Sequence, residues 1–313
     1  MILIANRASA LLYRFMKTFP KGPYLLPANV CPVVPLTFLK ANVPFEFLDI
    51  NEDTLCLDEN EVIDAVSSNS GHYAGMVFVR TYGYAYDASH FFSRIKSLDA
   101  GFKIIDDKCL CYPDFLPIAS SVDMELFSTG YAKIVDFGYG GYSKISKDAE
   151  LSSVNESFNL LSLHFLENKY KVCLNEKILL GSHPGDWLDT NEPKITREEY
   201  ETNINNSMKS AITQKQLINA IYEDNLPGVI HLNKKFQNWR YNILTEKKES
   251  ILYAIFHSGL FASSHFIPSN ILFNSSHFPI ADKISRSVIN LFNDFRFTED
   301  QAREICKVIC REL

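Results

Sequence analysis

The sequence predicts an α/β protein with a mainly parallel sheet in a larger domain and a smaller α+β domain after it. In the first 145 residues, short apolar runs alternate with amphipathic stretches. Strands that alternate with helical stretches at this spacing are typical of βαβ units, and such units form a parallel sheet. The expected strands are 24–28, 44–49, 75–80, 102–106, 122–127 and about 140–145, and the expected helices between them include 33–41, 59–67 and 87–97.

The second half of the chain is expected to be mostly helical. The polar and apolar pattern predicts helices over 147–170, 197–224, 233–260, 281–293 and 298–312, with a loop over 181–195. Proline and glycine interrupt helices, and Pro227 and Gly228 form a clear break after the second of them. We therefore predict a large domain over 1–226 and a small C-terminal domain over 227–313.

The composition excludes several classes of protein. The chain has 313 residues, of which 46% are hydrophobic and 22% are charged, and its formal net charge is −6. A negative net charge argues against nucleic acid as the main partner. No apolar run approaches the ~20 residues of a membrane span, and no basic region precedes a signal-like core. We expect a soluble, cytoplasmic protein with no nucleic-acid or membrane partner.

The cysteines predict neither a disulfide framework nor a metal site. Seven are present, which is an odd number. Cys109 and Cys111 form a Cys-x-Cys pair, but no matching second pair exists, and the chain has no His-Glu-x-x-His motif.

The most informative stretch of the chain is 123–141. A short apolar strand leads to the hydroxyl pair Ser128 and Thr129, and Lys133 and a glycine cluster follow. Hydroxyls and backbone amides bind phosphate, and a lysine amine forms a Schiff base with an aldehyde. These groups suit pyridoxal 5'-phosphate (PLP), although a lysine after a strand is also a common solvated surface residue.

A second feature lies about 20 residues upstream. The apolar run at 102–105 ends in Asp106 and Asp107. An acid at the C-terminal end of a parallel strand faces the ligand crevice, and in PLP enzymes such an acid pairs with the pyridinium nitrogen. The alternative is a strand-end or helix-capping pair of carboxylates.

Together these residues resemble the DegT-type nucleotide-sugar aminotransferases, which are PLP enzymes of fold type I. The residues that fit the family's spacing are Asp107, Asp123, Ser128, Lys133, Gly140 and Gly141. Looser similarity is found at 6–11, 26–32, 45–58, 80–83, 278–281 and 297–301, so the resemblance spans nearly the whole chain and thins between 145 and 260. It implies a PLP-dependent transferase of fold type I that acts as a homodimer.

The resemblance also implies roles for individual residues. Lys133 is the Schiff-base lysine and later moves the substrate proton, and Asp107 keeps the pyridine nitrogen protonated. Ser128 and the backbone amides of Ala8 and Ser9 receive the phosphate. Tyr82, or Tyr131, borders the cofactor ring, with an ordinary strand-end aromatic as the alternative.

Three further residues are candidates for binding the substrate. Arg80 is a candidate for a carboxylate or phosphate, with a structural ion pair as the alternative. Arg240 resembles a small-domain arginine that faces the site, with packing beside Trp239 as the alternative. His265 is expected to approach the site from the small domain, with an ordinary loop histidine as the alternative.

The chain departs from the family pattern at three places. It opens almost directly on the stretch 6–11, whereas family members usually have a longer N-terminal arm that helps to form the substrate pocket. Leu110 stands where the family has Gln or His three residues after the ring-pairing Asp. The family's Asn-x-Arg-Met segment, which reaches into the partner's site, is altered, and the candidates before Met208 are Asn203, Asn205 and Asn206. We select Asn205 as the cofactor-binding residue among them.

Three functions remain open from the sequence. The first is a PLP-dependent aminotransferase that moves an amino group from an amino acid to a keto-sugar nucleotide. The second is a PLP enzyme of the same fold with a non-sugar substrate, which Leu110 favours. The third is a non-catalytic PLP-fold binding protein, against which the presence of Lys133 and Asp107 argues.

Overall fold

The computed structural model describes residues 1–19, 21–146, 151–152, 154, 156–181, 185–265, 267, 270–273 and 276–313. Its largest element is a seven-stranded sheet in the order β1-β7-β6-β5-β4-β2-β3. Among the described strands of this sheet, β7 alone runs opposite to the others. The strands are β1 (Ile2–Ala5), β2 (Tyr24–Pro27), β3 (Phe45–Leu48), β4 (Gly75–Val79), β5 (Lys103–Asp107), β6 (Met124–Ser128) and β7 (Gly141–Ile145).

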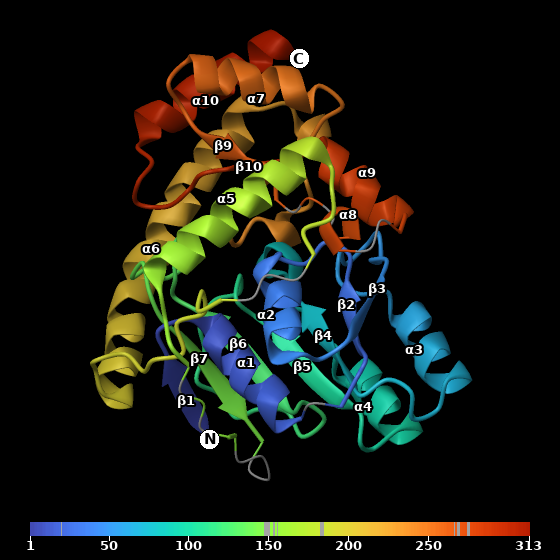
Figure 1. Cartoon of the computed structure of the whole chain (residues 1–313). Helices are drawn as coiled ribbons and strands as arrows, with labels where there is room; N and C mark the ends of the chain where they lie inside the picture. The colour runs from blue at the N-terminus through green and yellow to red at the C-terminus, as the bar shows by residue number, and fades with distance from the viewer. Residues whose placement is uncertain are drawn as a thin grey trace.

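Helices cover both faces of this sheet, as its sequence requires. Successive side chains of a strand point to opposite faces, so an apolar run of this kind must be buried on both. Leu26, Val77 and Ile105 pack in the core under α1 (Ala8–Thr18) and α2 (Val33–Ala41). Their chain neighbours pack in a second core with α3 (Glu59–Ser68) and α4 (Ser89–Leu98). Figure 1 shows α1 and α2 in front of the sheet.

A second, smaller sheet lies in the C-terminal part of the chain. It is antiparallel in the order β8-β10-β9 and contains β8 (Tyr241–Leu244), β9 (Ala262–Ser263) and β10 (Val288–Leu291). Its core is shared with α7 (Lys248–His257) and α10 (Glu299–Glu312). The remaining short helices are η1 (Thr81–Gly83), η2 (Gly228–Ile230), η3 (Lys234–Phe236), α8 (Asn270–Phe273) and α9 (Pro279–Ser287).

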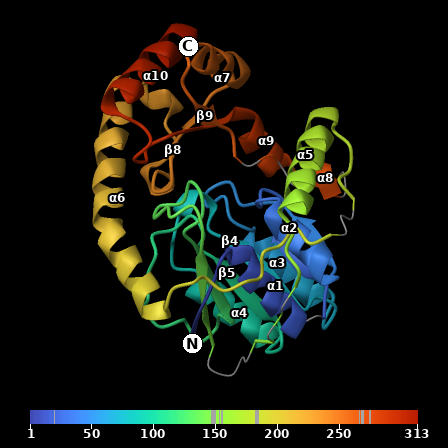
Figure 2. The same cartoon turned by 60° about the vertical axis from the view of Figure 1, so that its left-hand side comes forward.

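The long helix α6 (Arg197–Asn225) connects the two sheets. It begins with a capping box between Thr196 and Glu199. Tyr200 near its start packs with β6 and β7, whereas Tyr222 near its end packs in the core of the small sheet. Figure 2 shows α6 running along one side of the molecule from the large sheet to the small one. The predicted division after residue 226 stays a prediction.

The strand predictions for the large domain are confirmed to within two residues at each end. The helices predicted over 33–41, 59–67, 87–97, 197–224 and 298–312 are confirmed with similar boundaries. The strand β1 was not predicted. It pairs with β7 through Ile2–Ala5 and forms one edge of the large sheet.

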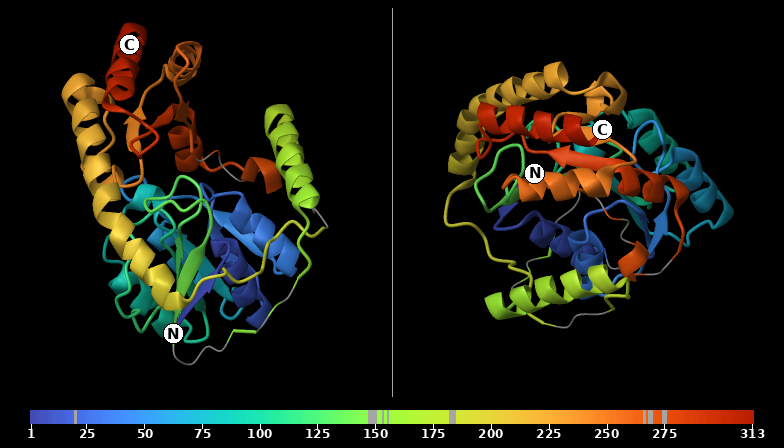
Figure 3. Two further views of the ribbon diagram at one scale, coloured as in Figure 1. Left: turned by 90° about the vertical axis from the view of Figure 1, so that its left-hand side faces the viewer. Right: turned by 90° about the horizontal axis from the view of Figure 1, so that it is seen from above.

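Three helix predictions are wrong in part. In place of 147–170, the helix is α5 (Leu160–Glu176), which Asn159 caps by accepting from the Leu161 N–H at 2.8 Å; residues 147–150, 153 and 155 lie outside the described residues. The stretch 233–260 contains η3, β8 and α7, because the apolar side chains of β8 pair with β10. The last residues of 281–293 form β10 for the same reason. Figure 3 shows α5 standing apart from α6 on the opposite side of the molecule.

No helix in the described part of the chain is long and apolar enough to cross a membrane.

Candidate active site

The predicted cofactor residues gather where the strands of the large sheet end. β5 ends at Asp107, β6 ends at Ser128, and β1 leads through Asn6 and Arg7 into α1. The C-terminal ends of parallel strands form one edge of the sheet, which is where α/β proteins bind ligands. Lys133 follows Ser128 in the loop to β7 and therefore belongs to this edge.

Asp107 faces the side of the sheet that α1 and α2 cover. It lies on the same face of β5 as Ile105, because side chains alternate along a strand. The carboxylate is 7% exposed, and its Oδ1 accepts from the Cys109 N–H at 2.9 Å. Burial raises the pKa of Asp107, while the Cys109 N–H and the charge of Lys133 lower it. A cationic partner would therefore stabilise this carboxylate.

Lys133 is half-buried and lines a cavity of about 790 Å³. One wall comes from α5, another comes from the start of α2, and the rest comes from loops of both parts of the chain. The charge of Lys133 lowers the pKa of the Cys31 and Cys109 thiols, although burial keeps both pKa values raised overall. The other lining residues are Cys31, Pro32, Val33, Leu36, Leu110, Tyr131, Ala132, Leu163, Leu166, Glu167, Tyr170, Lys171, Trp187, Trp239 and His265.

The start of α1 has the properties of a phosphate site. Its first turn contains no acidic residue, and Arg7 at the N-cap makes no side-chain capping bond. The N–H groups of such a turn attract anions. Gly141 of β7 passes so close that a Cβ there would lie 2.6 Å from the Ala8 nitrogen. Gly141 also pairs with Ser128 in the sheet, so Gly141 has the end of β6 on one side and the start of α1 on the other.

Gly140 has a separate structural reason to be glycine. Its φ is 93°, a conformation that other residues rarely adopt, and a Cβ would lie 2.5 Å from Tyr200 Oη and 2.6 Å from Thr129 Oγ1. Thr129 Oγ1 forms a hydrogen bond with Tyr200 Oη in this space. The glycine cluster thus packs the Lys133 loop against α6.

Tyr82, Trp239 and His265 form an aromatic group beside Lys133. The Tyr82 hydroxyl donates to the His265 carbonyl, and the Tyr82 ring lies parallel to the Trp239 ring with centroids 6.3 Å apart. The His265 ring lies 5.6 Å from the Trp239 ring. Burial, followed by the charges of Arg240 and Lys133, lowers the pKa of His265 to about 4. His265 is therefore neutral at neutral pH, and the unprotonated nitrogen of its ring can accept a hydrogen bond.

Arg240 is a buried cation that lacks a full set of partners. It is 4% exposed, lies over the Trp239 ring at 4.5 Å, and donates from Nη1 to Ser263. Its Nε has no hydrogen-bond partner among the described residues. Desolvation lowers the pKa of Arg240 to about 10, while Asp294 raises it. Buried polar groups are normally satisfied, so this guanidinium is suited to a carboxylate or phosphate.

Arg80, which was predicted as a candidate for binding substrate, is buried and donates hydrogen bonds to protein groups. Its Nε and Nη2 donate to Asp106 at 2.7 and 2.9 Å, and its Nη1 donates to the Tyr86 carbonyl at 2.7 Å. Asp106 and Asp107 are consecutive in β5 and point to opposite faces of the sheet. Arg80 therefore lies on the α3 and α4 side, where it forms the structural ion pair that was the alternative.

Asn205 is exposed on α6, and it is not among the described residues that line the cavity. Its predicted role in a partner's site stays a prediction.

The structure also reveals residues that sequence reasoning missed as parts of the site. Cys31, the α5 side chains Leu163 and Leu166, and Trp239 all line the cavity. Cys31 lies in the stretch 26–32 that resembles the family, but no local motif marks Leu163, Leu166 or Trp239. Within the described residues, no group of three or more His, Cys, Asp or Glu side chains is arranged to hold a metal ion.

Lys215 is a second buried lysine of this region. It is 3% exposed, and its Nζ donates to the Trp239 carbonyl at 2.7 Å and to Asn293 Oδ1 at 2.9 Å. Burial lowers the pKa of Lys215 from 10.5 to about 8, although Asp294 raises it. Below about pH 8 the folded protein therefore holds a buried charge that the unfolded chain solvates.

We expect Lys215→Met to change how stability depends on pH. Between pH 8 and 10.5 the unfolded wild type binds more protons than the folded protein, so wild-type stability rises with pH across this window. The total rise is about 3 kcal/mol, and the variant lacks it. Urea unfolding at several pH values measures the difference. Lys209→Met, an exposed lysine of the same helix, is the control. Parallel curves for wild type and Lys215→Met would contradict the prediction.

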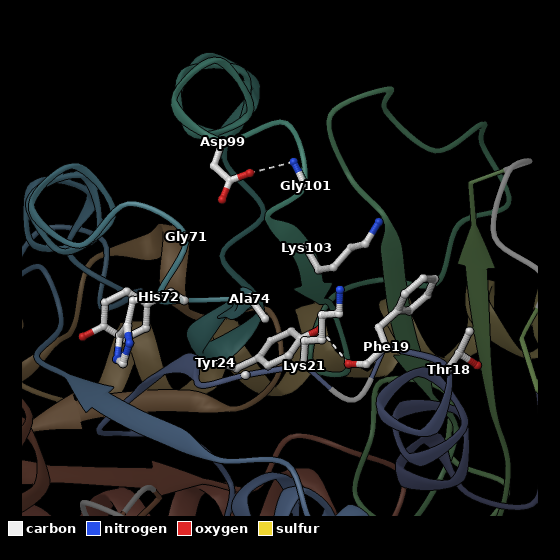
Figure 4. Close-up of a pocket in the computed structure, with 12 residues that line it drawn as sticks. Thr18, Phe19, Lys21, Tyr24, Gly71, His72, Ala74, Asp99, Gly101 and Lys103 are labelled. Carbon is white, nitrogen blue, oxygen red and sulfur yellow. Dashed lines mark hydrogen bonds between the residues drawn. The ribbon is translucent and has the colours of Figure 1, made fainter.

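A different cavity lies at the opposite ends of the strands (Figure 4). It has a volume of about 490 Å³ and is lined by residues at the beginnings of β2 and β5, including Tyr24 and Lys103. Its described lining residues include none of the predicted site residues.

Comparison with known proteins identifies the fold. No protein-family model and no curated protein matches the sequence. Solved structures do match over nearly the whole chain. Spr1654 of Streptococcus pneumoniae, a protein assigned as a sugar aminotransferase, superposes with a TM-score of 0.73 at 15% identity, covering 99% of this chain and 87% of that one. The chain has the fold of the DegT-type sugar aminotransferases.

Two further structures have this fold. DesI, solved in the presence of its TDP-sugar product, has a TM-score of 0.71 at 17% identity and covers 98% of this chain and 79% of its own. A DegT/DnrJ/EryC1/StrS aminotransferase from Brucella abortus has a TM-score of 0.68 at 14% identity, with 99% and 85% covered. The predicted fold class, the PLP-dependent transferase fold type I, is therefore confirmed.

The residues of this chain fit the cofactor of that fold. The Asp107 carboxylate, the Lys133 amine, the Ser128 hydroxyl and the start of α1 lie along one edge of the sheet. Gly141 has no side chain to fill the space beside the start of α1.

Proposed function

We propose that this chain is a PLP-dependent aminotransferase. The observation that carries the proposal is that the buried carboxylate of Asp107 and the amine of Lys133 lie at the same ligand edge of a sheet with this fold, close enough for the charge of Lys133 to act on Asp107. An amine and a carboxylate in this relation match the aldehyde and the pyridinium nitrogen of the cofactor. Ser128 and the amides of Ala8 and Ser9 would hold its phosphate.

The residues of the chain have distinct tasks in this proposal. Bound PLP supplies an electron sink for the carbon that loses a proton. Asp107 keeps the positive charge of the ring nitrogen in place, and Lys133 Nζ takes the proton from the α-carbon of the amino donor. Tyr82 supports the two aromatic residues of the cavity wall, because it packs against the Trp239 ring and donates to the His265 carbonyl.

Arg240 and His265 are proposed as the substrate-binding residues. The incompletely paired guanidinium of Arg240 is suited to the carboxylate of an amino-acid donor, because arginine binds carboxylates through paired N–H groups. His265 is neutral and lines the cavity together with Lys133, and the charges of both Arg240 and Lys133 contribute to its lowered pKa. Aromatic contacts of Arg240 with Trp239 and Phe292 hold the guanidinium in place.

For the acceptor we propose a keto-sugar nucleotide. The similarity in fold to DesI, which was solved with a TDP-sugar product, supports this class. We further propose a cytoplasmic homodimer in which exposed Asn205 serves the neighbouring subunit. The second candidate is a non-sugar carbonyl substrate, because Leu36, Leu110 and α5 leucines make much of the cavity wall apolar.

Covalent capture of the cofactor tests the proposed function. The purified protein is incubated with PLP and reduced with borohydride, and its peptides are analysed by mass spectrometry. The amine of Lys133 condenses with the aldehyde and releases water, and borohydride then reduces the C=N bond to a stable C–N bond. We expect the pyridoxyl group on the peptide that contains Lys133.

A half-reaction then separates the candidates. PLP-loaded protein is mixed with L-glutamate, and released 2-oxoglutarate is measured in the absence of an acceptor. Release of up to one equivalent per site supports an aminotransferase. Capture without release from L-glutamate or from a panel of amino acids favours a different reaction on the same cofactor. Absence of capture contradicts both enzymatic functions and leaves a binding scaffold.

A further inference from the structure

The turn that carries Lys133 has a backbone conformation that needs outside support. We call residues 130–137 the lysine turn. Ala132, directly before Lys133, has a φ of 58° in the left-handed region, which residues with a Cβ rarely adopt. Such a conformation persists only where surrounding contacts hold it. The contacts of Ala132 therefore decide where the Lys133 side chain begins.

Both peptide groups of Ala132 are held by side chains. The Ala132 N–H donates to Asp136 Oδ2 at 2.5 Å, and the Ala132 carbonyl accepts from Trp239 Nε1 at 2.6 Å. Asp136 belongs to the lysine turn itself, whereas Trp239 comes from a segment 107 residues further along the chain. The turn is thus fixed from within and from the C-terminal part of the protein.

Asp136 is itself fixed by the C-terminal part. Its side chain is 4% exposed, and Arg296 Nη2 donates to Oδ2 at 2.7 Å. The other oxygen, Oδ1, accepts from the Gly138 N–H at 2.8 Å. The Arg296 guanidinium also lies over the ring of Tyr131 at 4.7 Å. A carboxylate with three donors, one of which is the cation Arg296, has little freedom to release the Ala132 N–H.

Trp239 links the same turn to the proposed substrate region. Its ring lies under the Arg240 guanidinium and beside the His265 ring, and it lines the cavity with Lys133. Its own carbonyl accepts from the buried Lys215 Nζ at 2.7 Å. One rigid side chain therefore contacts the lysine turn on its edge and the candidate carboxylate-binding arginine on its face.

We propose that Trp239 and Asp136 are positioning residues that hold the lysine turn in the conformation from which Lys133 reaches its reaction partner. This inference rests on the proposed function. An amine that is held in the reactive position forms a bond much faster than one that must find it, so loosening the turn slows the bond-forming step. Neither residue is required to touch the cofactor.

The test compares the rate of cofactor capture in Trp239→Phe and Asp136→Asn with that of wild type. Each protein is mixed with PLP, samples are reduced with borohydride at timed intervals, and labelled Lys133 is quantified. We expect the rate to fall at least about tenfold in each variant, because small displacements of a reacting group have large effects on rate. Trp239→Phe removes the indole N–H, and Asp136→Asn removes the charge that pairs with Arg296.

Asp99→Asn is the matched control. Asp99 Oδ1 accepts from the Gly101 N–H at 2.8 Å, the same two-residue arrangement as Asp136 and Gly138, at the opposite end of the sheet (Figure 4). Its capture rate should equal that of wild type. A Lys133→Ala background supplies a second control, in which adding Trp239→Phe or Asp136→Asn should leave the noncovalent affinity for PLP unchanged.

The outcomes separate the two proposals. Absence of capture in wild type contradicts the proposed function itself. Capture in wild type with unchanged rates in a folded Trp239→Phe or Asp136→Asn protein overturns the positioning role. A loss of noncovalent affinity in the Lys133→Ala background as large as the loss of capture rate would also overturn it, because the residue would then act on the cofactor directly.

Hydrogen exchange tests the same inference without any cofactor, including the case in which the variants do not fold. In wild type, the amide of Ala132 should exchange slowly, as expected for an N–H held by a buried carboxylate. Peptides that cover the lysine turn are followed by mass spectrometry. Exchange of this amide as fast as that of an exposed loop would overturn the proposal.

Discussion

Replacing Lys133 with alanine is expected to abolish covalent capture of PLP and to slow the glutamate half-reaction by at least about 10⁴-fold. Lys133 is proposed both as the amine that bonds to the cofactor and as the base that removes the donor's α-proton. General acid–base catalysis alone contributes up to about 10⁴-fold, so losing both roles exceeds that factor. Single-turnover release of 2-oxoglutarate, together with borohydride labelling, measures the two losses separately.

Lys171→Ala provides the comparison. Lys171 is exposed and lines the same cavity from α5, so it offers a second amine to any aldehyde that enters. Labelling should stay on Lys133 in this variant. If Lys133→Ala were still labelled at a single other lysine and released 2-oxoglutarate at the wild-type rate, Lys133 would not be the reacting amine.

The large sheet could be predicted from the sequence because most of its strands are short apolar runs that turn residues bound. Met76, Val77 and Phe78 are buried on both faces of β4, and turn residues bound the run on each side. A run of this kind fits few structures other than a buried parallel strand. The sequence did not predict β1, because this strand lies at an edge of the sheet and most of its residues are only partly buried.

The strands of the small sheet could not be predicted from the sequence in the same way. β8 and β10 are only four residues long, and each is followed or preceded by a helix without an intervening glycine or proline. Their pairing joins Tyr241 to Leu291, residues that are far apart in the sequence. Periodicity within a short window does not detect such a pairing, so the helical pattern on either side was extended through both strands.

The site residues that are close together in the sequence were predicted, whereas several of those that only the fold brings together were not. The spacing of Asp107, Ser128 and Lys133 is local to adjacent strands and was visible in the sequence. The role of Arg80 depended on which of two consecutive aspartates faces the cavity, and only the sheet register decides that. The contact of Trp239 with the lysine turn joins segments that no local motif connects.

Asp107→Asn is expected to weaken the cofactor complex while leaving the cofactor-free protein at least as stable as wild type. Burial raises the pKa of Asp107, so near neutral pH the folded protein bears the cost of an ionised buried carboxylate that the unfolded chain solvates. Asparagine removes that cost and keeps an oxygen for the Cys109 N–H. The stability difference should therefore shrink as the pH falls toward the ordinary value of 3.8, where the unfolded carboxyl also becomes protonated.

The same substitution removes the charge proposed to face the pyridinium nitrogen. Losing one preorganised electrostatic partner costs on the order of 10²–10³-fold in rate, and we expect the glutamate half-reaction to slow by that factor. The rise in melting temperature on adding PLP should also be smaller, because ligand stabilisation follows affinity. Thermal melts with and without PLP, and single-turnover kinetics, measure both effects.

Asp106→Asn is the matched control, since the two aspartates are neighbours in β5 and face opposite sides of the sheet. Asp106 neutralises the buried guanidinium of Arg80 through two hydrogen bonds. Breaking a buried ion pair on one side costs about 3–5 kcal/mol, so this variant should be strongly destabilised without PLP. If it folds, its response to PLP should match that of wild type. If Asp107→Asn instead lost stability to the same extent and bound PLP normally, Asp107 would be a structural carboxylate and the site would need another partner for the ring nitrogen.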